Sequence, residues 1–381
     1  MSGVRRTIAV VTGTRAELGL LAPVMHAIDA HVALTLRCIV TGTHLTRGTW
    51  RSVRDHWGLR IDKRVAMQRK GERGRAADVA ALARGVAGLG QALVDLHADI
   101  VLVLGDRIEA FAAATAGSVG GVHVAHIHGG DRAEGVADEA MRHAITKLAH
   151  IHFPATAASR RRIVRMGERP EHVFNVGSPA IDELLLRERA QRREHRHVVV
   201  IQHPIGDSDG VERRRMRATL DAATAFHQCH GLTDPVIVFD SNDDPGSAGI
   251  DAAISETLGK RGASSGRYRH VRYAPRDELL ALLRQAAAIV GNSSAGLIDA
   301  AALRVPCVNV GPRQAGREKP ANVIDCDYGR EAVTAALEQA RTLDLRRMRH
   351  PYGRGNAPQR IAEHLATLDL ESIPLRKRNA Y

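Results

Sequence analysis

Short apolar runs and helical segments alternate along this chain, and the alternation constrains the fold more than any other feature of the sequence. In the first half, apolar runs of strand length lie at 8–12, 33–41, 100–104, 122–127, 151–154 and 173–176. Between them, apolar residues recur at helical spacing, at about 17–30, 77–96, 109–119, 138–149 and 158–166. Parallel strands need a crossover helix, so the pattern predicts an α/β fold with a parallel, doubly wound sheet.

The alternation stops near Ser178. An expected helix around Leu184 and a charged segment at 187–196 follow, and the alternation then starts again. The second set of strand-like runs is 197–201, 236–239, 268–273, 288–290, 307–310 and 323–326. A chain of 381 residues is too long for one ordinary domain. We expect two Rossmann-like domains, 1–182 and 183–356, facing each other across a cleft, and a helix in 357–381 that crosses back to the first. The polar segment 51–75 is expected to be a mobile loop or an insertion.

The composition indicates a solvated basic surface with a local anion site embedded in it, and it argues against nucleic-acid binding. The net charge is +12, from 54 Lys and Arg against 42 Asp and Glu, but the basic residues are spread over helix faces. Aromatic residues make up only 3% of the chain, which argues against single-strand binding. The four cysteines form no CxxC pair, so the sequence indicates neither a zinc site nor a disulfide framework. No apolar run approaches the roughly 20 residues of a membrane span, and we expect a soluble cytoplasmic protein.

The segment 126–150, HIHGGDRAEGVADEAMRHAITKLAH, is the first candidate for a reaction centre. It follows a strand-like run and passes through two glycines into a loop with imidazoles and carboxylates. Open α/β sheets place their active sites at such strand ends. The candidate residues are His128, Asp131 and Asp138. The alternative is an ordinary polar connection between a strand and a helix.

Two more candidates follow strands of the first half. Thr12-Gly13-Thr14-Arg15 lies where the first strand meets the first helix, and Arg15 with the helix N-terminus could bind a phosphate. The turn is not a GxGxxG fingerprint, so a nicotinamide cofactor is not favoured, and the alternative is a simple turn. Asp106 directly follows the apolar run 100–104 and is either a base, a group that orients one, or the N-cap of the next helix.

The second half has its own candidates for anion binding. His203 ends the run 197–201 and either faces the cleft or is structural. In the segment 291–296, GNSSAG, the hydroxyls of Ser293 and Ser294 and free N–H groups around Gly296 favour a phosphorylated ligand. The alternative is a serine-capped helix without a ligand. Asp299 could accept hydrogen bonds from ribose hydroxyls, and Arg313 adds a cation near the same strand ends.

In order and spacing, these segments resemble the UDP-N-acetylglucosamine 2-epimerase family, specifically its hydrolysing branch from sialic-acid and related nonulosonate pathways. The resemblance covers nearly the whole chain, through TGTRAELGLLAPVM, GDR, HIHGGDRAEGVADEAMRHAITKLAHIHF, NVGSPAID, QHP, GNSSAGLIDA and GPRQAGRE. It implies a GT-B fold, a nucleotide-sugar in the cleft, a homodimer, and no metal or redox cofactor.

The resemblance also implies a mechanism. The enzyme would remove the C2 proton and expel UDP from C1, leaving a 2-acetamidoglycal. Water would then add, with protonation of C2 from the opposite face, and release N-acetylmannosamine and UDP. Asp106 and Asp138 would be the acid/base residues, with Asp131 in or beside the loop.

The remaining roles implied by the resemblance concern binding. Arg142 would order the loop or the substrate, His44 would line the cleft, and Asp299 would hold the ribose. The departing diphosphate would be neutralised by Arg15, Ser293, Ser294 and Arg313, and His203 would contact the diphosphate or the leaving oxygen as part of the catalytic set.

The chain departs from the family pattern at His128, where many members carry an acidic residue, so that carboxylate is replaced or moved. RAELG replaces the commoner RADYG, and the residues after His203-Pro204 are unusual. The sugar therefore stays open between UDP-N-acetylglucosamine, a 4-acetamido-6-deoxy sugar and a GDP-linked sugar. The alternative functions are a non-hydrolysing epimerase, a GT-B glycosyltransferase and a nucleotide-sugar-binding protein.

Overall fold

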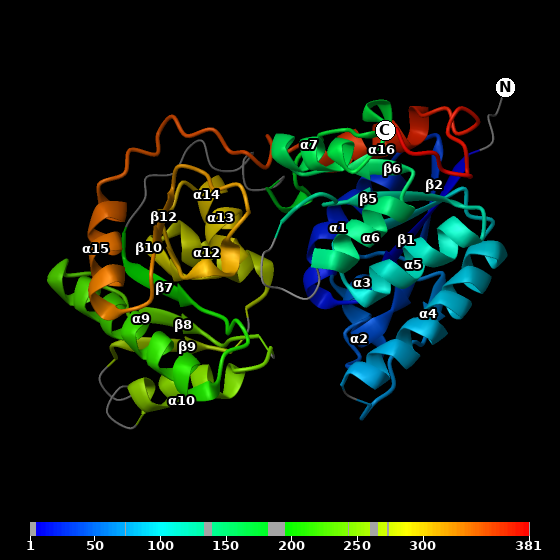
Figure 1. Ribbon diagram of the computed structural model, residues 1–381. Helices are drawn as coiled ribbons and strands as arrows, with labels where there is room; N and C mark the ends of the chain where they lie inside the picture. Colours follow the sequence, from blue (N-terminus) through cyan, green and yellow to red (C-terminus); the bar gives the residue numbers. More distant parts are fainter. Residues whose placement is uncertain are drawn as a thin grey trace. The chain divides into compact units, whose positions relative to one another are not determined.

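The computed structural model describes residues 5–72, 74–132, 139–181, 195–242, 244–259, 266–272 and 274–380. The chain divides into two compact units, each with a central sheet between helices (Figure 1). Unit 1 holds the described residues up to Arg132, those of 139–181, and those from Tyr352 onwards. Unit 2 holds the described residues from 195 to Pro351.

The sheet of unit 1 has six parallel strands in the order β3-β2-β1-β4-β5-β6. They are β1 (Arg6–Thr12), β2 (Leu34–Thr41), β3 (Lys63–Val65), β4 (Ile100–Leu104), β5 (His123–Ile127) and β6 (Ile151–Phe153). Every residue of β4, with the sequence IVLVL, is buried, as expected of a strand covered on both faces.

Helices cover both faces of this sheet because alternate strand residues point to opposite sides. Ile8 and Val10 of β1 pack in one core, and Ala9 and Val11 pack in the other. The first core is closed by α1 (Arg15–Asp29) and α16 (Ala357–Thr367), and the second by α4 (Arg75–Asp95), α5 (Ile108–Val119) and α6 (Glu139–Leu148). The remaining helical segments are α2 (Gly42–Thr46), α3 (Arg51–Asp55), α7 (Ala157–Arg165), η1 (Pro170–His172) and η2 (Pro179–Ile181).

Unit 2 repeats this topology with the sheet order β12-β11-β10-β7-β8-β9, again all parallel. Its strands are β7 (His197–Ile201), β8 (Val236–Phe239), β9 (Tyr268–Val271), β10 (Ala286–Gly291), β11 (Cys307–Val310) and β12 (Val323–Cys326). Its helices are α9 (Asp209–Cys229), α10 (Ser247–Leu258), α12 (Arg276–Arg284), α13 (Ser294–Leu297), α14 (Asp299–Ala302), η3 (Pro312–Gln314) and α15 (Arg330–Arg341).

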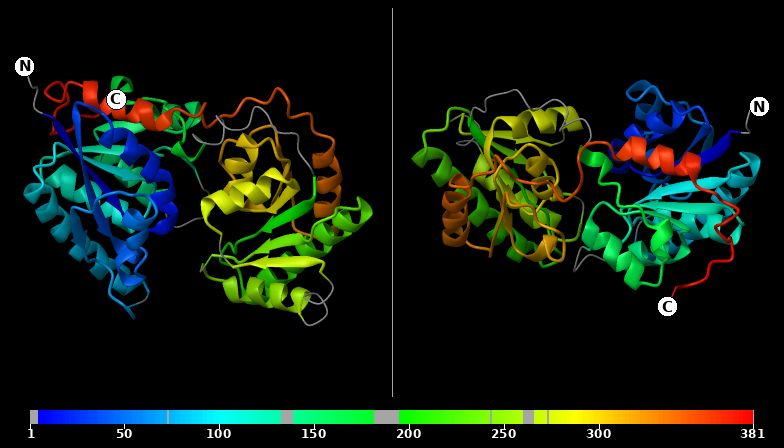
Figure 2. Two further views of the ribbon diagram at one scale, coloured as in Figure 1. Left: turned by 180° about the vertical axis from the view of Figure 1, so that it is seen from behind. Right: turned by 90° about the horizontal axis from the view of Figure 1, so that it is seen from above.

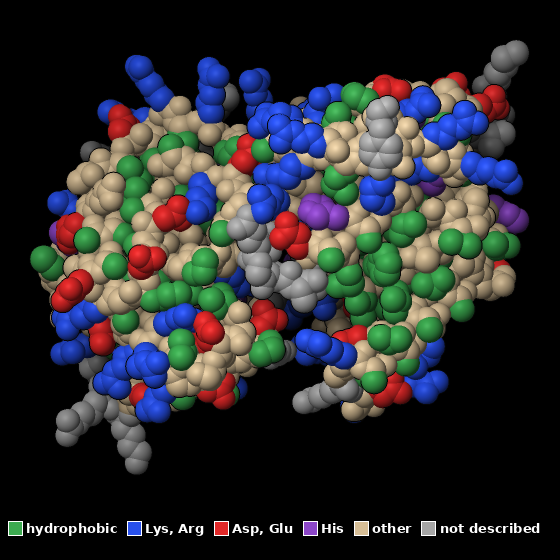
Figure 3. Space-filling view, in the orientation of Figure 1, with side chains coloured by type: hydrophobic (Ala, Val, Ile, Leu, Met, Phe, Trp, Pro, Cys, Tyr) green, Lys and Arg blue, Asp and Glu red, His purple; other side chains and the backbone are tan. Residues whose placement is uncertain are grey.

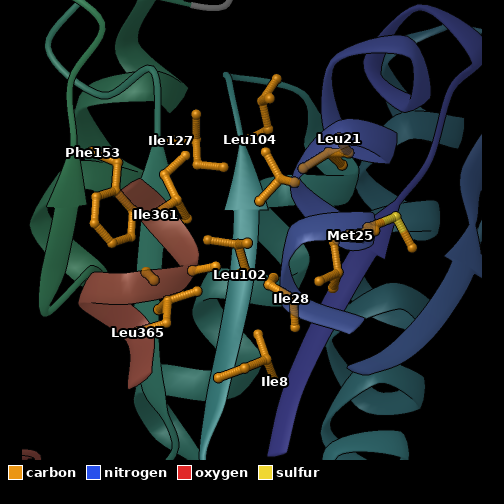
Figure 4. Close-up of a cluster of buried hydrophobic side chains, with 14 of the residues drawn as sticks. Ile8, Leu21, Met25, Ile28, Leu102, Leu104, Ile127, Phe153, Ile361 and Leu365 are labelled. Atoms are coloured by element: carbon orange, nitrogen blue, oxygen red, sulfur yellow. The ribbon is translucent and has the colours of Figure 1, made fainter. Parts of the chain in front are cut away.

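The last helix, α16, belongs to unit 1. It lies along α1, on the same unit as the N-terminal strand (Figure 2). Its residues Ile361 and Leu365 are fully buried and point into the core beside Leu102 (Figure 4). The chain that follows stays on unit 1, where the carbonyl of Ile373 accepts from His123 of β5 and that of Leu375 accepts from His150, just before β6.

Some sequence-based expectations were wrong. The segment 51–75 contains α3 and β3; β3 was missed because it has three residues, of which Lys63 and Arg64 are charged. The run 173–176 is not a strand, because only Val173 forms a bridge, to His152 at the sheet edge. Helix α10 was not anticipated. The helix expected around Leu184 lies outside the described residues.

Among the described residues, α4 alone is long and apolar enough to cross a membrane by length and composition. One side of α4 packs against the sheet through Leu89 and Leu93. Its packing is that of a helix covering an α/β sheet.

Candidate functional site

The candidate residues gather where the strand order reverses in each sheet. In unit 1 the reversal lies between β1 and β4, which are followed by the Thr12–Arg15 turn and by Asp106. In unit 2 it lies between β7 and β10, which are followed by His203 and by Ser293. Loops diverge at these points and leave a crevice at the carboxyl ends of the strands, which is where open α/β sheets bind ligands.

The turn after β1 is closed by a capping box. The Thr14 hydroxyl accepts from the Glu17 N–H at 3.3 Å, and the Glu17 carboxylate accepts from the N–H groups of Gly13 at 2.8 Å and Thr14 at 3.3 Å. Burial raises the pKa of Glu17 to about 8. These two backbone donors are thus occupied, and the exposed Arg15 side chain is the part of the turn suited to an anion.

His44 lies against the same turn and is fully buried. Its Nε2 is 3.3 Å from the Thr12 hydroxyl, and its Nδ1 is 2.8 Å from the Thr49 hydroxyl. Burial lowers the pKa of His44 to about 4, so the ring is neutral near pH 7. The geometry makes His44 a support of the first turn, with both ring nitrogens bonded inside unit 1.

Asp106 forms an ion pair with Arg142 of α6, whose side chain is 5% exposed. The same guanidinium donates to the carbonyl of Asp131 at 3.0 Å. Asp106 does not cap α5, because the N-cap of that helix is Arg107. Arg142 therefore links the loops that follow β4 and β5, and it holds one carboxylate at the end of a buried strand.

His128 occupies the position where a carboxylate was expected, and it is bonded on both sides. Its Nδ1 lies 3.0 Å from Asp131 Oδ2, and its Nε2 lies 2.9 Å from the Ser178 hydroxyl. The second oxygen of Asp131 accepts from the Ser159 hydroxyl at 2.6 Å. His128 has a φ of +63°, a strained conformation for a non-glycine residue, which the surrounding bonds sustain.

This serine–histidine–aspartate array stays bonded whichever charge the ring carries. An ionised Asp131 can only accept, so it selects the tautomer with a proton on Nδ1. The Ser178 hydroxyl can donate to a neutral Nε2 or accept from a protonated one. Ser178 is fully buried, which makes it an anchor for the ring. The array therefore holds the Gly129–Asp131 turn against the segment that precedes η2.

We expect His128→Ala to lower kcat by about 10- to 100-fold, because hydrogen bonds to charged groups contribute about 1.5–3 kcal/mol each. KM for the substrate should change little, since the bonds position the loop, and His128→Asn should restore part of kcat through its amide donor. Steady-state kinetics on both variants would measure this split. His143→Ala, on the neighbouring helix, is the matched control. Unchanged kcat in His128→Ala would exclude the positioning role.

Two further buried groups of unit 1 were not anticipated as neighbours of the site. His126 Nε2–H donates to the Gly105 carbonyl at 2.8 Å, and burial lowers the pKa of His126 to about 3, which identifies a neutral structural ring. Glu109 of α5 packs against Gly13 and Gly42 and accepts from Gln68 Nε2 at 2.8 Å. A Cβ at Gly13 would lie 2.4 Å from Glu109 Cγ, so this turn requires glycine.

In unit 2 the loops after β7 and β10 are joined by Asn292. Its side-chain oxygen accepts from the His203 N–H at 2.7 Å, and its side-chain nitrogen donates to the His203 carbonyl at 2.8 Å. Gly291 has a φ of +132°, and a Cβ there would lie 2.1 Å from the Ile201 carbonyl oxygen. The close approach of β7 and β10 therefore requires glycine at position 291, and Asn292 then joins the loops that follow these two strands.

His203 is held as a neutral hydrogen-bond donor. The Asn242 N–H donates to its Nδ1 at 3.1 Å, so the ring proton must sit on Nε2. Burial, and then the charge of Arg313, lower the pKa of His203 to about 3. An Nε2–H group with a fixed tautomer suits contact with a phosphate oxygen and does not suit proton exchange near pH 7.

Arg313 and Gln314, in η3, both contact the loop after β10 through Asn292. Gln314 Nε2 donates to the Asn292 carbonyl at 2.8 Å, and Arg313 does so at 3.4 Å. The Arg313 side chain is 19% exposed. Burial lowers the pKa of Arg313 from its usual value, and an anion would offset the cost of that burial.

Ser293 and Ser294 lie half-buried at the start of α13, where the Ser293 hydroxyl caps the Ala295 N–H at 3.3 Å. Gly296 packs on Cys307, whose Sγ would be 2.4 Å from an added Cβ, so its role in the structure is close packing. Asp299 pairs with Arg276 of α12 at 3.0 Å, while burial raises its pKa.

In unit 1, contacts join Asp106, Arg142, Asp131 and His128 into one group, while His44 supports the turn after β1 that carries Arg15. In unit 2, Asn292 contacts both His203 and Arg313, while Ser293, Ser294, Gly296 and Asp299 lie in the segment that follows β10, with Asp299 paired to Arg276. Asp138 lies outside the described residues.

Residues that the sequence interpretation missed are the partners of these side chains: Ser159, Ser178, Asn242, Arg276, Asn292 and Gln314. Ser178 stands in the NVGSPAID segment, and Asn292 stands in GNSSAG, so a signal was present for both. Nothing local distinguishes Ser159 or Arg276. Within the described ranges, no group of three or more His, Cys, Asp or Glu side chains is arranged to hold a metal ion.

Comparison with known proteins places this chain in a family. A profile of the UDP-N-acetylglucosamine 2-epimerase family matches residues 26–366. The UDP-N,N'-diacetylbacillosamine 2-epimerase (hydrolyzing) of Legionella pneumophila is 31% identical over 390 residues, covering 99% of this chain and 100% of that protein. The UDP-N-acetylglucosamine 2-epimerase of Neisseria meningitidis is 28% identical, covering 98% of each chain.

Solved structures share the fold. The UDP-GlcNAc 2-epimerase from Neisseria meningitidis, bound to UDP-GlcNAc, superposes with a TM-score of 0.76 at 17% identity, over 95% of this chain and 100% of that one. The Methanocaldococcus jannaschii enzyme, in complex with UDP-GlcNAc and UDP, gives 0.74 at 18% identity, over 94% and 99%. The predicted GT-B fold, with its two parallel six-stranded sheets, is confirmed. The chain belongs to the UDP-N-acetylglucosamine 2-epimerase family, and it is a nucleotide-sugar 2-epimerase.

Proposed function

We propose that this enzyme is a hydrolysing 2-epimerase that converts a UDP-linked 2-acetamido sugar into the free C2-epimeric sugar and UDP. The observation that carries the proposal is the pairing of Asp106 with the buried Arg142, beside the His128–Asp131 turn. Elimination needs a base at C2, and the ion pair places a carboxylate beside a buried cation at the end of a buried strand. The two solved relatives bound to UDP-GlcNAc support a nucleotide-sugar as the substrate.

The reaction would run in two stages. In the first, a unit 1 carboxylate takes the C2 proton, the C1–O bond breaks with its electron pair on the diphosphate, and a 2-acetamidoglycal forms. In the second, water adds at C1 while C2 is protonated on the other face, which inverts that carbon. Asp106 and Asp138 are the proposed acid/base residues, and His128 and Arg142 position the loop that carries Asp131.

Departure of the diphosphate would be assisted mainly by unit 2. Developing charge on the leaving oxygen is best stabilised by donors already in place. His203 offers Nε2–H in a fixed tautomer, and Arg313 offers a mostly buried cation. Arg15, Ser293 and Ser294 are the remaining proposed diphosphate contacts, and Asp299, tied to Arg276, is the proposed ribose contact.

The hydrolysing branch is proposed because the Legionella relative, matched over its whole length, is named as hydrolyzing. That relative acts on UDP-N,N'-diacetylbacillosamine, whereas the Neisseria relative is named for UDP-N-acetylglucosamine. Both sugars carry the 2-acetamido group that the glycal intermediate needs. We therefore propose these two as donors to be tested, in a homodimeric cytoplasmic enzyme.

Reaction of the purified enzyme with each donor in deuterated water, followed by NMR, tests the proposal. The expected products are UDP and a free C2-epimerised sugar that carries deuterium at C2, because the C2 proton exchanges with solvent. A UDP-linked epimer with deuterium at C2 would instead establish the non-hydrolysing reaction. Unlabelled sugar, or transfer of the sugar to an added acceptor, would contradict elimination and favour a glycosyltransferase.

A further inference from the structure

Helix α6 carries Arg142, so the position of this helix decides where the Asp106 carboxylate is held. Arg142 pairs with Asp106 and donates to the Asp131 carbonyl at 3.0 Å. The helix has 10 residues, and isolated helices of this length are marginal in water. The geometry of the ion pair therefore depends on contacts that hold α6 in place.

The last turn of α6 is capped by Lys377, a residue of the segment that follows α16. Its Nζ donates to the carbonyls of Thr146 at 3.1 Å and of Lys147 at 2.8 Å. Carbonyls in the last turn of a helix lack amide partners within the helix and carry the negative end of its dipole. A cation that donates to two of them satisfies these groups and offsets the dipole charge.

The ammonium of Lys377 is turned towards unit 1 and away from water. Figure 3 shows Lys and Arg side chains gathered around α7 on the surface of this unit, whereas the Lys377 side chain is only 21% exposed. Glu168 Oε2 lies 2.5 Å from its Nζ. Burial lowers the pKa of Lys377 to about 8, although Glu168 opposes this shift, so the group is cationic at pH 7.

Bonds on both sides of Lys377 fix the backbone that presents it. Before it, the carbonyls of Ile373 and Leu375 accept from imidazoles of unit 1 at 2.9 Å and 3.1 Å. After it, the Ala380 N–H donates to the Gly167 carbonyl at 2.8 Å. A segment held on either side delivers the ammonium to one place at the end of α6.

Thr146 connects the capped turn to Arg142. Its carbonyl accepts from Lys377, and its buried hydroxyl donates to the Arg142 carbonyl at 3.0 Å. Arg142 lies one turn before Thr146 on the same helix. Loss of the cap would let the last turn open and the backbone at Arg142 move, and the guanidinium would then no longer hold Asp106 in one position.

We propose that Lys377 is a positioning residue for the 2-epimerase reaction: it fixes the last turn of α6, the helix fixes Arg142, and Arg142 fixes the Asp106 carboxylate. The inference rests on the proposed role of Asp106 as an acid/base residue. A residue that only stabilised the fold would change the free energy of unfolding and leave kcat of the folded enzyme unchanged.

Lys377→Met keeps the stem of the side chain and removes the cap. It should lower kcat about 10- to 100-fold, because displacing a reacting group by about 1 Å can cost about 100-fold. KM should change little, since the nucleotide contacts are proposed mainly for unit 2. The rate is measured as deuterium incorporation at C2 with UDP-N-acetylglucosamine, which the hydrolysing and the non-hydrolysing reaction share. Lys377→Gln, which keeps an N–H donor, should show the same split with a smaller loss.

Arg6→Met is the matched control. The Arg6 guanidinium donates to the carbonyls of Leu365 and Leu368 at the end of α16, so it caps a helix of the same unit that carries no candidate residue. Arg6 begins β1, at the opposite end of the strand from the site. The variant should keep kcat within about twofold, because distant sites act independently. Circular dichroism and thermal unfolding would establish that all three variants are folded.

A double-mutant cycle tests the route through Asp106. If Lys377 acts by holding this carboxylate, Lys377→Met should change the kcat of Asp106→Asn by no more than about twofold, since effects of coupled residues are not additive. The same fold-loss of kcat in both backgrounds would overturn the proposal. So would an equal loss in Arg6→Met, or a raised KM with unchanged kcat in Lys377→Met.

Amide hydrogen exchange separates this proposal from the proposed function. Amides of α6 should exchange about tenfold faster or more in Lys377→Met than in the wild type, whichever reaction the enzyme performs, because the uncapped turn opens more often. Arg6→Met should instead speed exchange in α16. Unchanged exchange in α6 would overturn the positioning role of Lys377. A wild type that incorporates no deuterium at C2 of either donor would overturn the proposed function.

Discussion

Asp106→Asn should lower kcat by about 10²- to 10⁴-fold, the range that a positioned acid/base group contributes. Asparagine keeps the size of the side chain and can still bond to Arg142, but it cannot take a proton from C2. The mutation also removes the carboxylate charge that pairs with the Arg142 guanidinium, whose side chain is 5% exposed, so the loop carrying Asp131 loses order as well. Release of UDP and deuterium incorporation at C2, measured together, would report the loss.

The control for Asp106→Asn is Asp344→Asn, an exposed aspartate of unit 2 that pairs with Arg346. It removes the same charge far from any strand end and should leave kcat within about twofold, because exposed ion pairs contribute about 1 kcal/mol or less. If Asp106→Asn retained wild-type kcat and still incorporated deuterium, Asp106 would not be an acid/base residue. Asp138 would then carry the proposal alone.

The largest stability effect is expected at Glu168, which is 2% exposed and lies between two lysines and a histidine. Lys147 Nζ lies 2.7 Å and Lys377 Nζ 2.5 Å from its oxygens, and His152 Nε2 lies 3.1 Å away. Removing one partner of a buried ion pair costs about 3–5 kcal/mol, and the two lysines, 35% and 21% exposed, can regain some water. Glu168→Gln should therefore lower the free energy of unfolding by about 2–4 kcal/mol.

The same variant makes a pH prediction. Burial alone would raise the pKa of Glu168, but bonds from His152, Lys147 and Lys377 outweigh burial and lower it to about 2. The folded pKa is below the unfolded one, so the stabilisation is present above about pH 4.5 and is lost as the pH falls towards 2. The difference between wild type and Glu168→Gln should shrink over that window.

Urea unfolding at pH 7 and pH 3 would measure both effects of Glu168→Gln. Glu338→Gln, which removes an exposed pairing with His230, is the matched control and should change stability by less than about 1 kcal/mol. Equal stability of Glu168→Gln and wild type at pH 7 would contradict the prediction. Because Lys377 belongs to the chain after α16, the result also reports how firmly that segment is attached to unit 1.

Strands whose residues are all apolar could be located from the sequence. Strands that contain charged residues could not. The run 100–104 is β4 residue for residue, because a strand buried on both faces must be continuously apolar. At β3, by contrast, pairing with β2 alone defines the strand, and Lys63 and Arg64 carry no apolar signal. The buried side of helix α10 contains two isoleucines, a glycine and an alanine. Small residues also occur on its other sides, so the sequence shows no clear helical spacing of apolar residues.

The positions of the candidate residues were predictable for a topological reason. Parallel strands end at the same edge of a sheet, so side chains that follow consecutive strands must gather there. Asp106 and His203 were located in this way. Arg142 was a candidate as well, but its pairing with Asp106 was not predictable, nor was that of His203 with Asn292, because each pairing joins residues far apart in the chain.

The sequence by itself determined the α/β fold, the family and the strand ends at which the chemistry is expected, since each of these depends on local periodicity and residue type. Only the tertiary structure decided what each polar group does there. The Asn242 N–H makes His203 a neutral donor, and Glu17 occupies the backbone donors after β1. Ser178, fifty positions from His128, holds the ring that replaces a carboxylate. Protonation state and orientation are set by neighbours in space, and those neighbours come from distant parts of the chain.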